Sequence, residues 1–188
     1  MKKIVKSLVA VLFLLGIASQ VNASESYTFQ NTQLKAKNGK VAEVFLGVPL
    51  TVKKDLGTKS KVVISGFRFD DKPNNIYSSK GKELVIATIA DGFEVSKKSG
   101  NVVELVGVIE NEMITQDALE IWEEHEEFYF DMCSVCHAAP QVPHHSMLEW
   151  EALFAPMKGF AKIDDTEANY LLRYIKSNAS NGLVKTKH

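Results

Sequence analysis

The sequence predicts an α+β multidomain protein in which a small all-β domain, a barrel or a sandwich, precedes an all-α domain. Turn residues separate short β-branched runs from residue 26 to about 114. From residue 115 on, apolar residues recur at three- and four-residue steps. We therefore divide the 188 residues into an N-terminal leader (1–23), a β-rich domain (24–114) and a helical domain (115–188).

The leader has the pattern of a secretory signal peptide. Lys2, Lys3 and Lys6 precede an apolar run over 8–18, which is shorter than the roughly 20 residues that a membrane-spanning helix needs. Small residues at Val21 and Ala23 predict cleavage after Ala23. We expect a bacterial periplasmic protein with no stable membrane insertion after cleavage, and an uncleaved anchor is the alternative.

Within the β-rich domain, four segments are predicted strands: 41–50, 61–67, 83–89 and 101–109. Turn chemistry at Gly57 and at 70–75, 80–82 and 99–101 separates them. Roughly ninety residues are enough for one modest core.

Three helices are predicted after residue 115. The first begins beyond an N-cap at Thr115 and runs into the cysteines, and the second surrounds Trp150. The third begins at Asp164, because Asp at the N-cap and Glu167 three residues later form a capping-box pair, and it stops at 181–182.

Negative charge is concentrated ahead of and around the cysteines. Residues 101–157 hold twelve Asp or Glu and no Lys or Arg. The ordinary interpretation of the glutamates at 120, 123, 124, 126 and 127 is a solvated helix face. The functional interpretation is a docking surface for a positively charged protein, and no nucleic-acid partner is expected.

Both cysteines of the chain lie in the run Cys133-Ser134-Val135-Cys136-His137. The two thiols of a Cys-x-x-Cys-His motif can bond the two vinyl groups on one edge of a haem while the adjacent imidazole reaches the iron. The motif predicts one covalent haem c, with thioethers at Cys133 and Cys136 and His137 as proximal iron ligand. The helical domain is therefore expected to be cytochrome c-like.

Other uses of the two cysteines are less favoured. A disulfide is the default for an exported pair, but this spacing closes only a small ring. A thioredoxin-like dithiol would need a βαβ setting. A structural zinc site could draw on Cys133, Cys136 and two of the histidines 137, 144 and 145, although a His directly after the second Cys is not the usual metal spacing.

The sixth iron ligand is open between several residues downstream of His137. Met157 is favoured because it follows Trp150 by seven residues and is expected to end a short helix before Gly159. His144 is the main alternative, His145 and Met147 are further candidates, and a core methionine is the structural alternative for Met157. We expect His125 to be a surface or interface residue.

These features together resemble the monohaem C-terminal domain of TorC-type cytochromes. The shared features are the helix before Cys-x-x-Cys-His-x-x-Pro, His144, the Trp150 to Met157 spacing and a closing helix over 164–179. The segments 47–50 and 76–82 also look similar to the region that precedes that domain.

The resemblance implies an electron-transfer protein rather than an enzyme. TorC-type cytochromes are pentahaem quinol dehydrogenases that pass electrons to a periplasmic molybdenum reductase acting on trimethylamine N-oxide. This chain has one haem motif, so a separate quinol-oxidising donor or an upstream cytochrome would reduce it, and a molybdenum reductase of N-oxide or S-oxide type would accept its electrons. A haem enzyme or a haem-based sensor with an exchangeable sixth ligand is the alternative.

Overall fold

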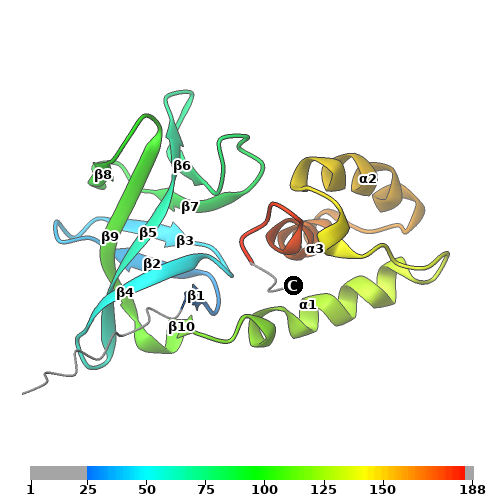
Figure 1. Cartoon of the computed structure of the whole chain (residues 1–188), viewed down its shortest axis with the longest axis horizontal. Coiled ribbons are helices and arrows are strands. Elements are labelled where there is room, and N and C mark those ends of the chain that lie inside the picture. Colours follow the sequence, from blue (N-terminus) through cyan, green and yellow to red (C-terminus); the bar gives the residue numbers. More distant parts are fainter. Residues whose placement is uncertain (1–24, 185–188) are drawn as a thin grey trace, which may run out of the picture.

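Strands form the first two thirds of the molecule and helices the last third (Figure 1). The computed structural model describes residues 25–184, and the predicted signal peptide lies outside them. The strands are β1 (Ser26–Thr28), β2 (Thr32–Lys35), β3 (Val41–Val44), β4 (Pro49–Asp55), β5 (Lys59–Phe69), β6 (Lys72–Tyr77), β7 (Val85–Ile89), β8 (Val95–Lys97), β9 (Val102–Glu110) and β10 (Ile114–Thr115). The helices are α1 (Ala118–Cys133), α2 (Met147–Phe160) and α3 (Asp165–Asn178), with short 3-10 turns η1 (Asn111–Met113) and η2 (Val142–His144).

Six of the strands close an antiparallel barrel. The order runs β5-β6-β7-β3-β2-β9, and β9 returns to β5 over a long register from Lys59↔Glu110 to Phe67↔Val102. Strand β4 pairs with the first half of β5, β1 and β10 extend outward from β4, and β8 pairs with β9. Alternate residues of β9 face inward, so that Val103, Leu105 and Ile109 are buried.

The strand predictions are partly confirmed. The segments 61–67, 83–89 and 101–109 correspond to β5, β7 and β9. The segment 41–50 is not one strand, because the chain turns at Gly47 (φ 74°) between β3 and β4. Residues 72–75, expected to be a turn, instead pair with β5 and β7 as part of β6.

The helix ends follow local hydrogen bonding. Helix α1 is capped by Asp117, whose side chain accepts from the Leu119 amide, and the predicted cap Thr115 instead pairs with Tyr27 in β10. Helix α3 has the predicted capping box between Asp164 and Glu167, but it ends at Asn178, ahead of 181–182. Helix α2 has its own capping box from Ser146 and continues past Met157 to Phe160, so the expected helix end at Met157 is wrong.

The expected fold class, an all-β domain followed by an all-α cytochrome c-like domain, is wrong. Most of the described chain is a six-stranded antiparallel barrel with additional strands, and only three short helices follow it. The buried residues of the helices and of the barrel form one hydrophobic cluster. Helices of 14 to 16 residues present too little apolar surface for a large core of their own, so they bury part of it against the barrel.

Two contacts attach the helices to the barrel. The Trp122 ring of α1 covers Gly47 so closely that a Cβ at this glycine would lie 2.2 Å from Cζ2 of the indole. From α3, Arg173 donates from Nε to the Leu46 carbonyl (3.0 Å) and from Nη1 to the Val85 carbonyl (2.8 Å). Within residues 25–184, no helix combines the length and the apolar character required to cross a membrane.

Candidate functional site

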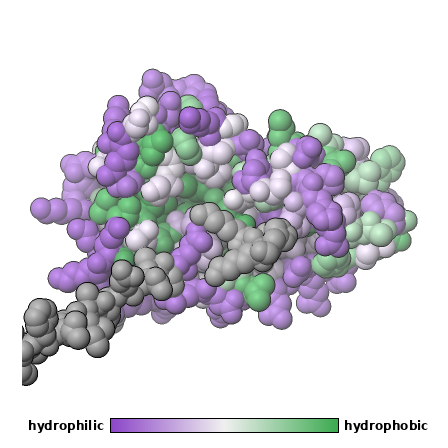
Figure 2. All heavy atoms as spheres, in the orientation of Figure 1, coloured by the Kyte–Doolittle hydropathy of each residue, from purple (hydrophilic) through white to green (hydrophobic). Residues whose placement is uncertain are grey.

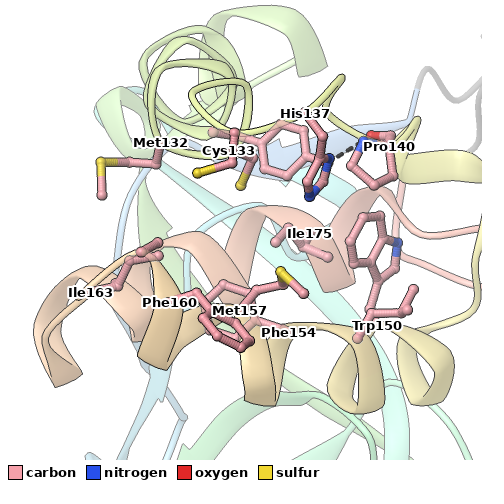
Figure 3. Close-up of a pocket in the computed structure, with 14 residues that line it drawn as sticks. Met132, Cys133, His137, Pro140, Trp150, Phe154, Met157, Phe160, Ile163 and Ile175 are labelled. Atoms are coloured by element: carbon pink, nitrogen blue, oxygen red, sulfur yellow. Dashed lines mark hydrogen bonds between the residues drawn. The ribbon is translucent and has the colours of Figure 1, made fainter.

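An apolar cavity of about 530 Å³ lies between the end of α1, α2 and α3 (Figure 3). Its volume lies in the range of roughly 300–1,000 Å³ that is usual for small-molecule and cofactor sites. The lining residues are Tyr129, Met132, Cys133, Cys136, His137, Pro140, Trp150, Leu153, Phe154, Met157, Phe160, Ala161, Ile163 and Ile175. The cavity therefore contains the complete Cys-x-x-Cys-His motif and the favoured methionine.

The two cysteines reach the cavity from the end of α1. Cys133 is the last residue of the helix and is half-buried, and Cys136 is exposed in the turn that follows. Neither thiol is engaged in a disulfide. Burial raises the pKa of the Cys133 thiol, so this group stays protonated near neutral pH.

One ring nitrogen of His137 is engaged in a hydrogen bond within the chain. Its Nδ1 lies 2.9 Å from the Ala138 carbonyl oxygen. Because a carbonyl only accepts, Nδ1 must carry the proton in this contact, and the neutral ring then keeps its lone pair on Nε2. An outer hydrogen bond of this kind fixes the tautomer and orientation of a histidine that ligates a metal through Nε2.

Met157 faces His137 across the cavity. Figure 3 shows the imidazole on the α1 side and the thioether on the α2 side, with Ile175 of α3 behind them. The alternative residue, His144, lies exposed in η2 and does not line the cavity. His145 contacts the edge of the Trp150 ring, and Met147 is fully buried outside the cavity.

Two side-chain hydrogen bonds hold the segment that follows the motif. Buried Tyr129 donates its hydroxyl proton to the Pro140 carbonyl (2.6 Å), and Trp150 donates from Nε1 to the Val142 carbonyl (2.9 Å). Both aromatic rings line the cavity, so the same side chains shape its wall and fix the chain beyond His137.

Several lining residues were not predicted as part of the site. Met132 precedes Cys133 and brings a second thioether to the cavity, and Phe160 and Ile163 come from the end of α2 and the following turn. Ile175 of α3 also lines the cavity. Its position next to the cysteines depends on the packing of α3 against α1 and α2.

The structure does not favour the zinc alternative. Among the described residues, no group of three or more His, Cys, Asp or Glu is placed to hold a metal ion. His144 lies outside the cavity that contains Cys133, Cys136 and His137. His145 does not line it either, so among the described residues no second histidine joins the thiols and His137 there.

The donor set and the cavity fit a covalently attached haem. Two uncrosslinked thiols, an imidazole whose Nδ1 is in a hydrogen bond with a carbonyl, and a soft thioether line one apolar space. These are the ligand types that c-type haem uses, and an apolar environment excludes water from the iron.

The chain is similar to curated cytochromes. It is 24% identical over 173 residues to "Cytochrome c-type protein TorY" of Escherichia coli O157:H7, an alignment that covers 86% of this chain and 46% of that protein. It is 33% identical over 67 residues to "Cytochrome c-type protein TorC" of Escherichia coli K12, covering 36% of this chain and 17% of TorC. The aligned part of the chain thus spans about half the length of TorY and a smaller share of TorC. No family model matches the chain, and no solved structure matches it significantly.

Proposed function

We propose that this chain is a periplasmic electron-transfer protein that carries one haem c in the cavity between α1, α2 and α3. The observation that carries the proposal is the meeting of Cys133, Cys136, His137 and Met157 in one apolar cavity. When bound, the haem would supply a one-electron couple between ferric and ferrous iron.

Each residue has a separate role in holding the group. The Cys133 and Cys136 thiols would each add across one vinyl group, so that an S–C bond forms and the thiol hydrogen passes to the neighbouring vinyl carbon. His137 would bind the iron through Nε2, because its Nδ1 proton is donated to the Ala138 carbonyl. Met157 would supply a neutral, soft donor, which favours the ferrous state.

The remaining lining residues keep the site rigid and dry. Tyr129 and Trp150 tie the segment after His137 through their hydrogen bonds to the carbonyls of Pro140 and Val142. With His137 and Met157 both holding the iron, the site would change little between oxidation states, which suits electron transfer better than substrate turnover.

The proposed donor and acceptor are those that the resemblance to TorC-type cytochromes implies. We propose a quinol-oxidising protein or another cytochrome as donor and a periplasmic molybdenum reductase, acting on an N-oxide or S-oxide, as acceptor. The similarity to TorY, at 24% identity over 86% of this chain, supports a place in an electron-transfer chain of this kind.

Mass spectrometry of the exported protein tests the proposal. Expression with a working cytochrome c maturation system should give a mass increased by one intact haem, and Cys133→Ala together with Cys136→Ala should remove it. Ser134→Ala is the matched control, because it changes the same turn and leaves both thiols. An exported wild-type protein without added haem would contradict the proposal.

Carbon monoxide binding separates the carrier from a haem enzyme or sensor. With His137 and Met157 both bound, the reduced protein should take up carbon monoxide slowly and incompletely at neutral pH. Rapid, stoichiometric uptake would favour an exchangeable sixth position and therefore a sensor or an enzyme.

A further inference from the structure

A second concave surface runs along α1, outside the cysteine cavity. This α1 groove has a volume of about 700 Å³ and lies between α1, the η2 segment, α3 and Val184. Its polar lining consists of four carboxylates, those of Asp117, Glu120, Glu123 and Glu126, and of the amides of Gln141 and Asn178. Among residues 25–184, no Lys, Arg or His lines it.

Two large apolar side chains lie at the same groove. Leu119 is 80% exposed and Phe130 is 40% exposed, and both line it. They are eleven residues apart, which is about 16 Å along the helix. Figure 2 shows mostly hydrophilic residues along the lower edge of the molecule, where α1 runs in Figure 1. Exposed apolar residues within a charged rim are typical of protein-binding sites.

Contacts between aromatic rings connect the α1 groove with the cysteine cavity. Phe130 at the groove contacts Tyr129 edge-on, with ring centroids 5.4 Å apart. Tyr174 also lines the groove, and its ring centroid lies 5.8 Å from that of Tyr129. Tyr129 itself is buried and lines the cavity beside Cys133 and His137.

We propose that the α1 groove is the docking site of a redox partner protein whose surface presents lysine or arginine side chains around an apolar one. The proposal rests on the proposed electron-transfer function and specifies the face on which the partner binds. The four carboxylates attract such a surface and repel anionic membranes and nucleic acids. Leu119 and Phe130 provide apolar contact with the partner. The Tyr129 ring gives the electron a short path between the partner and the cavity.

A pair of charge reversals on one helix turn tests the proposal. Glu123 lines the groove, and its neighbour Glu124 lies about 100° around the helix and does not. Glu123→Lys and Glu124→Lys change the net charge equally, so a difference between them reports the groove alone. The probe for the rate is tris(phenanthroline)cobalt(III), a trivalent cation with an apolar surface, which oxidises the reduced haem protein.

At low ionic strength, Glu123→Lys should slow this oxidation at least about threefold more than Glu124→Lys does. The difference should vanish in high salt, where the attraction is screened. Equal slowing by both variants would overturn the proposal, because it would report net charge rather than the groove.

A binding footprint provides a readout that does not need electron transfer. Reduced mitochondrial cytochrome c, a lysine-rich protein, should shift amide resonances of residues 117–130 and 141–143 of the full-length protein, and Leu119→Ala should weaken the shifts. Shifts centred on the barrel or at the cavity mouth, or self-association of the protein alone, would overturn the proposal. The footprint is recorded on the exported full-length protein together with its mass, so a footprint on protein that proves to carry no haem separates a failure of the haem proposal from a failure of the docking site.

Discussion

The imidazole of His125 stacks face to face on the phenol ring of Tyr170, with centroids 3.7 Å apart and planes within 9°. The pair joins α1 to α3, and the Trp122 ring lies nearly perpendicular to the imidazole, with ring centroids 5.2 Å apart. His125, expected from the sequence to be a surface or interface residue, is buried between helices, and its Nδ1 has no hydrogen-bond partner among the described residues. Burial, with a smaller contribution from the positive charge of Arg173, lowers its pKa to about 4.

This depressed pKa predicts that the protein loses stability as the pH falls from about 6.5 to 4. Above that window the imidazole is neutral in both states. Within it the unfolded chain binds a proton and the folded chain does not, so the free energy of unfolding falls by about 3 kcal/mol in total. Urea unfolding at several pH values should show a shallower pH dependence for His125→Phe, which keeps a ring against Tyr170. Identical slopes for wild type and variant would contradict the assignment.

Replacing Arg173 should loosen the contact between α3 and the barrel. Arg173→Met removes the bonds to the Leu46 and Val85 carbonyls and leaves these acceptors unpaired, which we expect to cost about 3 kcal/mol. Urea unfolding measures the loss. Lys158→Met is the matched control, because its ion pair with highly exposed Asp165 should contribute nothing measurable. Equal effects would show that Arg173 does not carry the contact.

Gly47→Ala should destabilise the protein far more than Gly39→Ala. Both glycines have positive φ (74° and 81°), so both substitutions introduce backbone strain of about 1 kcal/mol. A Cβ at Gly39 meets nothing within 4 Å, whereas at Gly47 it overlaps the Trp122 ring. We therefore expect an additional loss of about 2 kcal/mol or more at Gly47, seen as a larger fall in melting temperature. Similar melting temperatures would mean that α1 moves away from the barrel at little cost.

Met157→Ala should remove the charge-transfer band that methionine ligation gives to ferric haem. Met132→Ala is the matched control, because it deletes the other thioether of the cavity and should leave the band unchanged. Visible absorption of the ferric protein is the measurement. If the wild type lacks the band and His144→Ala makes the haem high-spin, then His144 is the ligand and the loop around η2 must rearrange to bring it there.

Local sequence patterns predicted those parts of the structure that depend on residues close together in the chain. The capping box at Asp164 and Glu167 was predictable because its hydrogen bonds join residues three apart, and the proximity of Cys133, Cys136 and His137 follows from their adjacency in the chain. The N-cap of α1 was predicted at Thr115, two residues before the observed cap, Asp117. Thr115 instead belongs to β10, because it pairs with Tyr27, a residue far away in the sequence.

The sequence by itself determined the strands β5, β7 and β9 and the existence of three helices, and the haem chemistry of the Cys-x-x-Cys-His motif stays a prediction. Tertiary structure decided that the helices pack on a six-stranded barrel, because the overlap of Trp122 with Gly47 and the reach of Arg173 to Leu46 and Val85 join residues 75 to 127 positions apart. It also placed Met157 opposite His137 and left His144 outside the cavity. These positions depend on how α2 and α3 bury their apolar faces, and periodicity gives the face of a helix without giving the surface that covers it.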